Sequence, residues 1–241
     1  MLLKLRFFRH SSYIWSRMDG KNQITVLTIG FGLRIPARLL YLFRGAIIHS
    51  LEHDDVLFHN HADEGYRYSY PLIQYRQLDG RAALVCIGDG IDAAMDCLPD
   101  FPCQVNIGTR RTQLDVDSVV EQKVLVQLDE LPRLYSLRGW LPLNEKNYVE
   151  YQRLSGIYEK CAFLESILIG NILSFGKGVG VNFEGELKCT IEDIFDMRFE
   201  IYKRVGMQAF DLTFSSNVNL PDDIGLGKGV SLGFGTIRRL R

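Results

Sequence analysis

The sequence predicts an α+β protein with two domains of similar size, each built in the order βαββαβ. Apolar residues alternate with other residues in several short segments, as they do in strands with one buried face. Between these segments they recur at the three- and four-residue spacing of helices. A comparable succession occurs twice within the 241 residues, a length that allows two ordinary domains.

The first half contains four predicted strands and two predicted helices. Residues 22–35 alternate and form the first strand, and Pro36 then begins a helix that runs to about Ser50. Asp79-Gly80 is a two-residue hairpin signal, because glycine tolerates the positive φ that a type I′ turn requires. The other elements are hairpin strands at 72–77 and 81–87, a short helix at 91–98 and a strand at 116–126.

The second half repeats this order less completely. A strand is expected at 134–141, followed by Asn144 as an N-cap and by a long amphipathic helix from Ile157 that Gly176 ends. Further strands are expected at 179–183, 199–201, 210–214 and 236–240, and no second helix is evident. Because βαββαβ is the ferredoxin-like (RRM-like) unit, we expect two tandem ferredoxin-like domains. The predicted parts are an N-terminal extension at 1–20 and domains at 21–129 and 130–241.

Composition narrows the class without naming a function. Hydrophobic residues make up 46% and charged residues 24%, as in globular proteins, and the net charge of -1 means that any nucleic-acid surface must be local. No apolar run reaches the roughly 20 residues of a membrane helix. The cysteines are odd in number, contain no C-x-x-C pair and favour a reducing cytoplasm over a disulfide framework or a zinc ribbon. They are Cys86, Cys97, Cys103, Cys161 and Cys189.

A glycine-rich segment, GLGKGVSLGFG, occupies residues 225–235. Glycine permits positive φ and close approach, so consecutive backbone N–H groups can turn toward a phosphate. Lys228 is followed by Gly229, which excludes a P-loop, and six residues after Gly235 leave no room for a dinucleotide-binding βαβ unit. A glycine-rich hairpin without a ligand is the alternative. The candidate phosphate-binding residues here are Gly225, Gly227, Lys228, Gly229, Gly233 and Gly235.

The segment GLGKGVSLGFGTIRRL closely resembles the C-terminal signature of the CRISPR repeat-processing endoribonucleases of the RAMP superfamily. LPLNEKNYVEYQRL and ILIGNILSFGKGVGV also look like the C-terminal domain of a subgroup of that family. The resemblance implies that the loop helps to hold RNA and that the protein cuts the repeat of a precursor CRISPR RNA without a cofactor. It also implies repeat RNA as partner, with other CRISPR-associated effector subunits as further candidates. The expected assembly is a monomer or a homodimer, between which the sequence does not decide.

Four of the five histidines fall within residues 49–61. Histidine exchanges protons near neutral pH, so one imidazole can deprotonate the 2′-OH and another can protonate the departing 5′ oxygen. The products would be a 2′,3′-cyclic phosphate and a 5′-OH. The family commonly places a catalytic histidine between the first helix and the second strand, which favours His61 or His59. His49 near the helix end is a further candidate, although it also suits a packed position.

Cationic residues near the scissile phosphate are less clear. Relatives often use a lysine, but this chain has no lysine between Lys21 and Lys123. Arg67 or Arg76 can take that part, because arginine is a fork-shaped phosphate binder. Arg238 and Arg239 follow the glycine loop and are the other candidate RNA contacts.

Other readings of the histidine segment remain open. His59 and His61 with Asp63 and Glu64 nearby can ligate a metal, or the histidines can lie in a solvated loop without a role. An RNA-binding relative without catalysis and a protein-interaction module on the same scaffold are the rival functions, since the fold alone does not decide between them.

Overall fold

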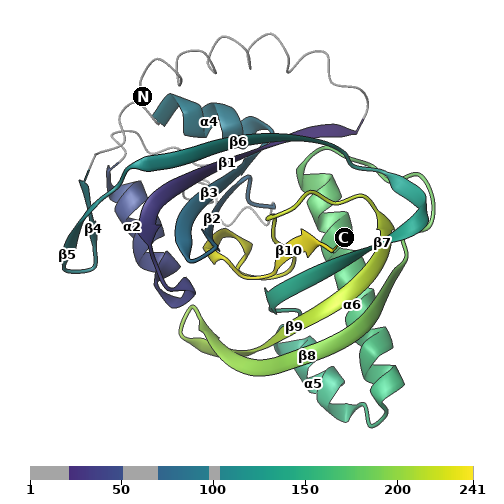
Figure 1. The fold of residues 1–241 in the computed structure, drawn as a ribbon. Coiled ribbons are helices and arrows are strands. Elements are labelled where there is room, and N and C mark those ends of the chain that lie inside the picture. The colour runs from purple at the N-terminus through teal and green to yellow at the C-terminus, as the bar shows by residue number, and fades with distance from the viewer. Residues whose placement is uncertain (1–21, 51–69, 98–103, 241) are drawn as a thin grey trace, which may run out of the picture.

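The computed structural model describes residues 22–50, 70–97 and 104–240 and contains two four-stranded antiparallel sheets (Figure 1). The strand order is β2-β3-β1-β6 in the first sheet and β10-β7-β9-β8 in the second. In each sheet the first and third strands of the domain lie in the middle. Two ferredoxin-like domains are therefore confirmed.

The first domain matches the predicted order closely. Asp79 and Gly80 have φ values of 49° and 80°, as the predicted hairpin turn requires. A two-stranded hairpin, β4 with β5, was not predicted, because its short segments carry few apolar residues. The elements are β1 (Gln23–Arg34), η1 (Ala37–Leu39), α2 (Leu40–Ser50), β2 (Ile73–Leu78), β3 (Arg81–Ile87), α4 (Asp89–Cys97), β4 (Gln104–Ile107), β5 (Arg110–Gln113) and β6 (Val116–Leu125).

The second domain contains β7 (Leu128–Trp140), α5 (Glu145–Arg153), α6 (Ile157–Gly178), β8 (Cys189–Tyr202), β9 (Val205–Val218), η3 (Val230–Leu232) and β10 (Thr236–Arg239). Asn144 is the N-cap of α5, where its side chain accepts a 2.8 Å hydrogen bond from the Asn147 N–H. The glycine loop and its 3-10 turn stand where the second helix of a ferredoxin-like unit belongs. Glu130, the expected start of this domain, lies within β7, and only Val126 and Gln127 separate β6 from β7.

Two expectations for the second domain were wrong. The long helix does not end at Gly176 but two residues later, because Gly176 is a packing position where an added Cβ would meet Phe183 and the Val181 carbonyl. The predicted strand at 179–183 is a loop that folds back on the helix, and the Val181 N–H donates to the Gly176 carbonyl at 2.8 Å. The alternation in that segment reflects one-sided packing on α6 and not pairing in a sheet.

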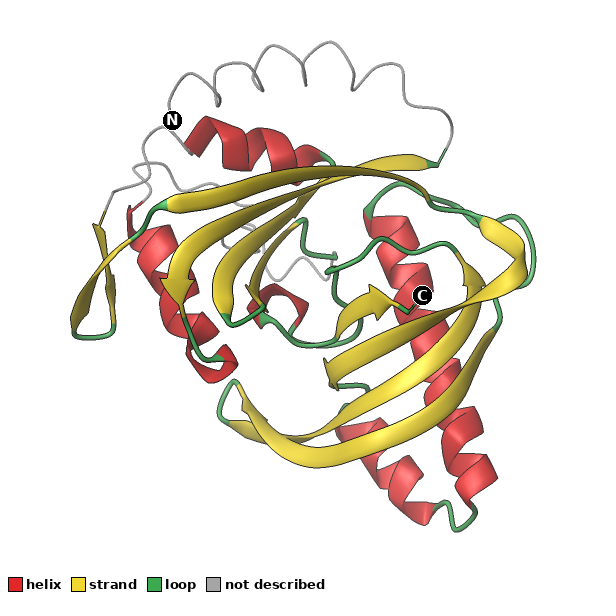
Figure 2. Ribbon diagram, viewed as in Figure 1, coloured by secondary structure: helices red, strands yellow, loops and turns green. Residues whose placement is uncertain are grey.

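Helices cover one face of each sheet, and the faces without helices turn toward the centre of the molecule (Figures 1 and 2). Helices α2 and α4 pack on the first sheet through Phe43 and Ala94, and α6 packs on the second through Leu164 and Ile172. On its other face the first sheet contributes Val26, among other residues, to the core of the second domain. Among the described helices, none is long and apolar enough to cross a membrane.

Candidate nucleic-acid interface

The glycine loop lies between the two sheets, next to β10 (Figure 1). Gly227, Gly229, Gly233 and Gly235 have φ values of 88°, 70°, 89° and 65°, a region that side chains other than glycine rarely adopt. A Cβ at Gly235 would meet the carbonyl group of Leu226 across the turn. The segment therefore needs these glycines to reverse direction twice in a small volume.

Most N–H groups of the loop are used inside the protein. Leu226 donates to the Gly235 carbonyl at 2.9 Å, and Gly235 donates to the Gly139 carbonyl at 3.1 Å. The N–H of Lys228 donates to Leu141 of the same domain at 3.3 Å. The loop thus differs from the expected run of consecutive N–H groups open to a phosphate, although the Lys228 side chain is exposed.

Strand β2 of the first domain holds the loop from its other side. The Tyr70 hydroxyl donates to the Gly225 carbonyl at 2.8 Å, and the Gly225 N–H donates to Gln74 Oε1 at 3.1 Å. Arg76 donates from Nη1 to the Val230 carbonyl at 2.8 Å and from Nε to the Asp223 carbonyl at 3.0 Å. These bonds connect the domains through a buried polar cluster.

Arg76 was a candidate phosphate contact, and the structure contradicts this assignment. Its side chain is 0% exposed, and its donors are directed at main-chain carbonyls and Gln74. Burial lowers the pKa of Arg76 to about 10, against the opposing effects of Tyr70 and Asp223. Arg76 therefore remains a cation at neutral pH, but it binds the glycine loop instead of a ligand.

A cavity of about 480 Å³ opens where the loop meets both sheets. The first domain lines it with the start of α2 and the end of β2, and the second domain lines it with β7, β8, β10 and the loop residues 232–234. Asp79 and Glu200 also line it, but they are outnumbered there by four arginines. The arginines are Arg38, Arg138, Arg198 and Arg238.

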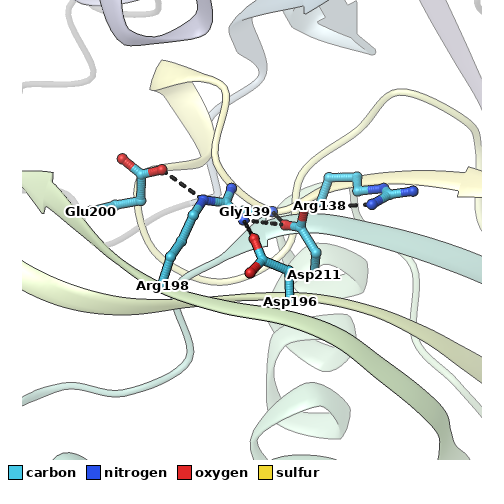
Figure 3. A network of polar contacts seen from close by, with 6 residues as sticks. All are labelled: Arg138, Gly139, Asp196, Arg198, Glu200 and Asp211. Carbon is cyan, nitrogen blue, oxygen red and sulfur yellow. Dashed lines mark hydrogen bonds and ion pairs between the residues drawn. The ribbon is translucent and has the colours of Figure 1, made fainter.

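Arg198 is the centre of a polar network on the helix-free face of the second sheet (Figure 3). Its guanidinium binds Asp196 at 2.7 Å, Glu200 at 2.8 Å and Asp211 at 3.1 Å. Partial burial alone would lower the pKa of Arg198, but hydrogen bonds to Glu200 and Asp196 and the charge of Asp211 raise it overall. The carboxylates thus fix a permanent cation in one orientation.

Asp211 connects this network to the next strand. Its Oδ1 accepts a 2.5 Å hydrogen bond from the Gly139 N–H, and its Oδ2 lies 3.5 Å from Arg138 Nη1. The Asp211 carboxylate is only 14% exposed, so its partners are protein groups rather than solvent. One side chain therefore positions two of the arginines that line the cavity.

The other two arginines differ in their partners. Arg238 pairs with Asp223 at 2.7 Å and with Asp79 of the β2–β3 turn at 3.4 Å, so it also joins the domains. Arg38 is exposed and has no carboxylate partner among the described residues. Arg239 is exposed at the end of β10 and does not line the cavity.

The histidine candidates are only partly described. His49 is exposed near the end of α2, whose first residue, Leu40, lines the cavity. At 1.5 Å per residue, the helix axis separates His49 from Arg38 by roughly 16 Å, so the structure does not bring His49 into the cavity. His59, His61 and Arg67 lie outside the described residues. Within the described ranges, no group of three or more His, Cys, Asp or Glu side chains can hold a metal ion.

Sequence reasoning missed Arg138, Arg198 and Asp211. A signal was present in β8, where Asp196, Arg198 and Glu200 alternate with three large apolar residues. This period of two places the charged side chains together on one face. The cross-strand position of Asp211, by contrast, depends on pairing that sequence does not fix.

The arrangement of two ferredoxin-like domains joined across a glycine loop is the one found in endoribonucleases that process CRISPR RNA. Residues 22–124 match the model of the Cas6b N-terminal domain, and residues 127–240 match that of the Cas6b C-terminal domain. The chain belongs to the Cas6b family.

Individual proteins agree with this assignment. A structure described as that of Cas6b is 27% identical in sequence and superposes with a TM-score of 0.83. The match covers 90% of this chain and 100% of the Cas6b chain. A structure described as the CRISPR RNA processing endoribonuclease Cas6b is 25% identical with a TM-score of 0.71 and the same coverage. An uncharacterized protein of Methanocaldococcus jannaschii is 40% identical over 101 residues, which are 42% of this chain and 67% of that protein.

Proposed function

We propose that this protein binds the repeat of a precursor CRISPR RNA in the cavity between its domains and cuts it once within each repeat. The observation that carries the proposal is the meeting of four arginines with the family's glycine loop at one cavity. Repeat RNA is the principal partner in this proposal, and CRISPR-associated effector subunits would receive the product.

Arginines suit such a site because their planar guanidinium groups bind phosphate with two parallel hydrogen bonds. Arg138 and Arg198 are held in place by Asp211, so less conformational entropy is lost when they bind RNA. Arg38 has no carboxylate to release among the described residues and is the most available cation. Lys228 and Arg239 would extend the contact along the RNA from outside the cavity.

The chemical step we propose is attack of the 2′-OH on the adjacent phosphorus atom without a metal. A base removes the 2′ proton, the bond from phosphorus to the 5′ oxygen breaks, and an acid protonates that oxygen. This gives a 2′,3′-cyclic phosphate and a 5′-OH. Each proton transfer typically contributes ~10²–10⁴-fold to the rate.

His61 and His59 are the proposed proton-transfer residues, with Arg67 as the proposed cation at the scissile phosphate. The support is the residue chemistry and, for the histidines, the position of their segment between the first helix and the second strand, where the family commonly carries a catalytic histidine; all three residues lie outside the described ranges. His49 has less support than these two, because it lies at the opposite end of α2 from the cavity.

The direct test is cleavage of labelled RNA from the CRISPR repeat nearest the gene, with EDTA present, by wild type, His61→Ala and His59→Ala. The expected result is cleavage by wild type in EDTA and loss in at least one variant, with a cyclic phosphate detected by mass spectrometry. Tight binding without cutting would identify a non-catalytic RNA-binding relative. Loss of wild-type activity only in EDTA would replace the proposed mechanism by a metal site in the histidine segment.

A further inference from the structure

Phe195 lies at an irregularity in edge strand β8. Ile194 pairs with Leu212 and Asp196 pairs with Asp211, which are neighbours on β9. Phe195 is therefore an extra residue on β8 that has no partner in the β8–β9 pairing. Such a bulge alters the direction of a side chain. Phe195 is 43% exposed, so part of its ring is accessible from solvent.

The bulge brings Phe195 to the helix-free face of the sheet. The guanidinium carbon of Arg138 lies 4.2 Å from the centre of the Phe195 ring, and Arg138 also contacts Asp211 on that face. Beyond the bulge, Phe199 pairs with Gln208 and follows Met197, whose partner Phe210 is buried in the core on the helix side. Phe195 and Phe199 therefore face opposite sides of one strand.

The pair formed by Phe195 and Arg138 has the chemistry of a base-stacking surface. Unpaired bases stack on aromatic rings and on arginine guanidinium planes, and one side of a sheet is a common place for such contacts. Arg138 is 59% exposed, so stacking on Phe195 does not use up its surface. Asp211 restrains the guanidinium further (Figure 3).

We propose that Phe195 and Arg138 form a stacking platform for one unpaired nucleobase of the RNA, at the β8 side of the interdomain cavity. This proposal rests on the proposed RNA-binding function and adds a requirement: the nucleotide on the platform is not base-paired. Arg138 lines the cavity and its guanidinium lies over the Phe195 ring, so a base stacked there would adjoin the RNA bound in the cavity. The platform would determine which nucleotide of the RNA lies at the cavity, and Phe195 would contribute to binding without adding positive charge.

The test uses a single-stranded RNA of twelve nucleotides of mixed sequence, with 2-aminopurine placed at each position in turn. Fluorescence reports stacking, and titration reports affinity for wild type, Phe195→Ala, Phe195→Leu, Arg138→Lys and Phe199→Ala. Phe199→Ala is the matched control, since it removes an exposed phenylalanine, 69% exposed, from the other face of the same strand. Thermal unfolding of each variant verifies that it is folded.

We expect wild type to quench 2-aminopurine at one position, and both Phe195 variants and Arg138→Lys to lose this quenching. Affinity should fall on the order of tenfold, as for loss of one stacked base, without a change in the salt slope of Phe195→Ala. Binding of the same sequence as a duplex should be unaffected. Equal behaviour of Phe195→Ala and Phe199→Ala, or full quenching by Phe195→Leu, would overturn the platform. Absence of quenching at every position would also overturn the platform, whereas failure of wild type to bind the CRISPR repeat RNA itself would overturn the proposed function.

Discussion

The Arg76 guanidinium donates a 2.8 Å hydrogen bond to the Val230 carbonyl, 154 residues further along the chain. The donor belongs to the first domain and the acceptor to the glycine loop of the second. Both are buried, so water cannot replace either partner. The conformation of the loop is therefore determined by a strand of the other domain as well as by its own glycines.

Replacing Arg76 by methionine should destabilise the protein by roughly 2–4 kcal/mol, because buried carbonyl acceptors lose their donor. Urea unfolding measures this loss, and RNA affinity should fall with it because the loop lines the cavity. The matched control is Arg81→Met, which breaks an exposed ion pair with Asp117 and should cost less than about 1 kcal/mol. Similar losses in the two variants would show that the bonds of Arg76 to the loop contribute little.

The Asp211→Asn variant tests whether Asp211 affects RNA affinity through its charge or through the positioning of arginines. Asp211→Asn makes the cavity more positive, so simple electrostatics predicts tighter RNA binding. We expect weaker binding instead, by about tenfold, because the carboxylate that orients Arg138 and Arg198 is lost. Filter binding of single-stranded RNA at fixed salt measures the effect. Asp117→Asn, with the same charge change at an exposed site, should bind like wild type or more tightly; tighter binding by both variants would exclude a positioning role.

Gly235→Ala and Gly180→Ala separate backbone strain from close approach. Gly180 has a φ of 75° with nothing within 4 Å of an added Cβ, so alanine should cost roughly 1–2 kcal/mol. Gly235 has a φ of 65°, and its Cβ would also meet the Leu226 carbonyl, which adds about 1–3 kcal/mol. Denaturant midpoints measure the difference. If the two variants were destabilised equally, the loop around Gly235 could shift to accommodate the added Cβ. Its contacts with both domains would then not hold it in place.

Alkaline pH should weaken the fold through Cys86. Burial raises the pKa of the Cys86 thiol to about 12, above its ordinary value of 9.0. Stability from the neutral thiol is therefore complete below pH 9 and is lost as the pH rises toward 12, with a slope of up to about 1.4 kcal/mol per pH unit. Unfolding measured from pH 8.5 to 10 should show a shallower slope for Cys86→Ala. The partly exposed Cys161 is the control, and its alanine variant should change the slope less.

Much of the fold was predictable because period-two alternation and turn chemistry are local. The β2–β3 hairpin followed from Asp79-Gly80, and the α5 N-cap followed from Asn144. The false strand at 179–183 shows the limit of this reasoning. Alternating burial also arises where a loop packs on a helix, and sequence alone does not separate the two.

The site was less predictable, because its decisive contacts join distant segments. Arg76 has the residue type of a phosphate binder, and only its complete burial shows that it binds carbonyls instead. Conversely, Arg138 and Phe195 carry no motif, and the bulge in β8 that places them together is visible only in the pairing register. Residue type suggested the chemistry, but long-range pairing decided which arginines line the cavity.

The glycine loop and β10 consist of the final residues of the described chain, 225–240. Translation therefore produces nearly all of both sheets before the segment that joins them exists. Until it emerges from the ribosome, Arg76, Gln74 and Tyr70 lack their partners in the loop. A product that terminated before residue 225 would lack the loop and the β10 residues that line the cavity.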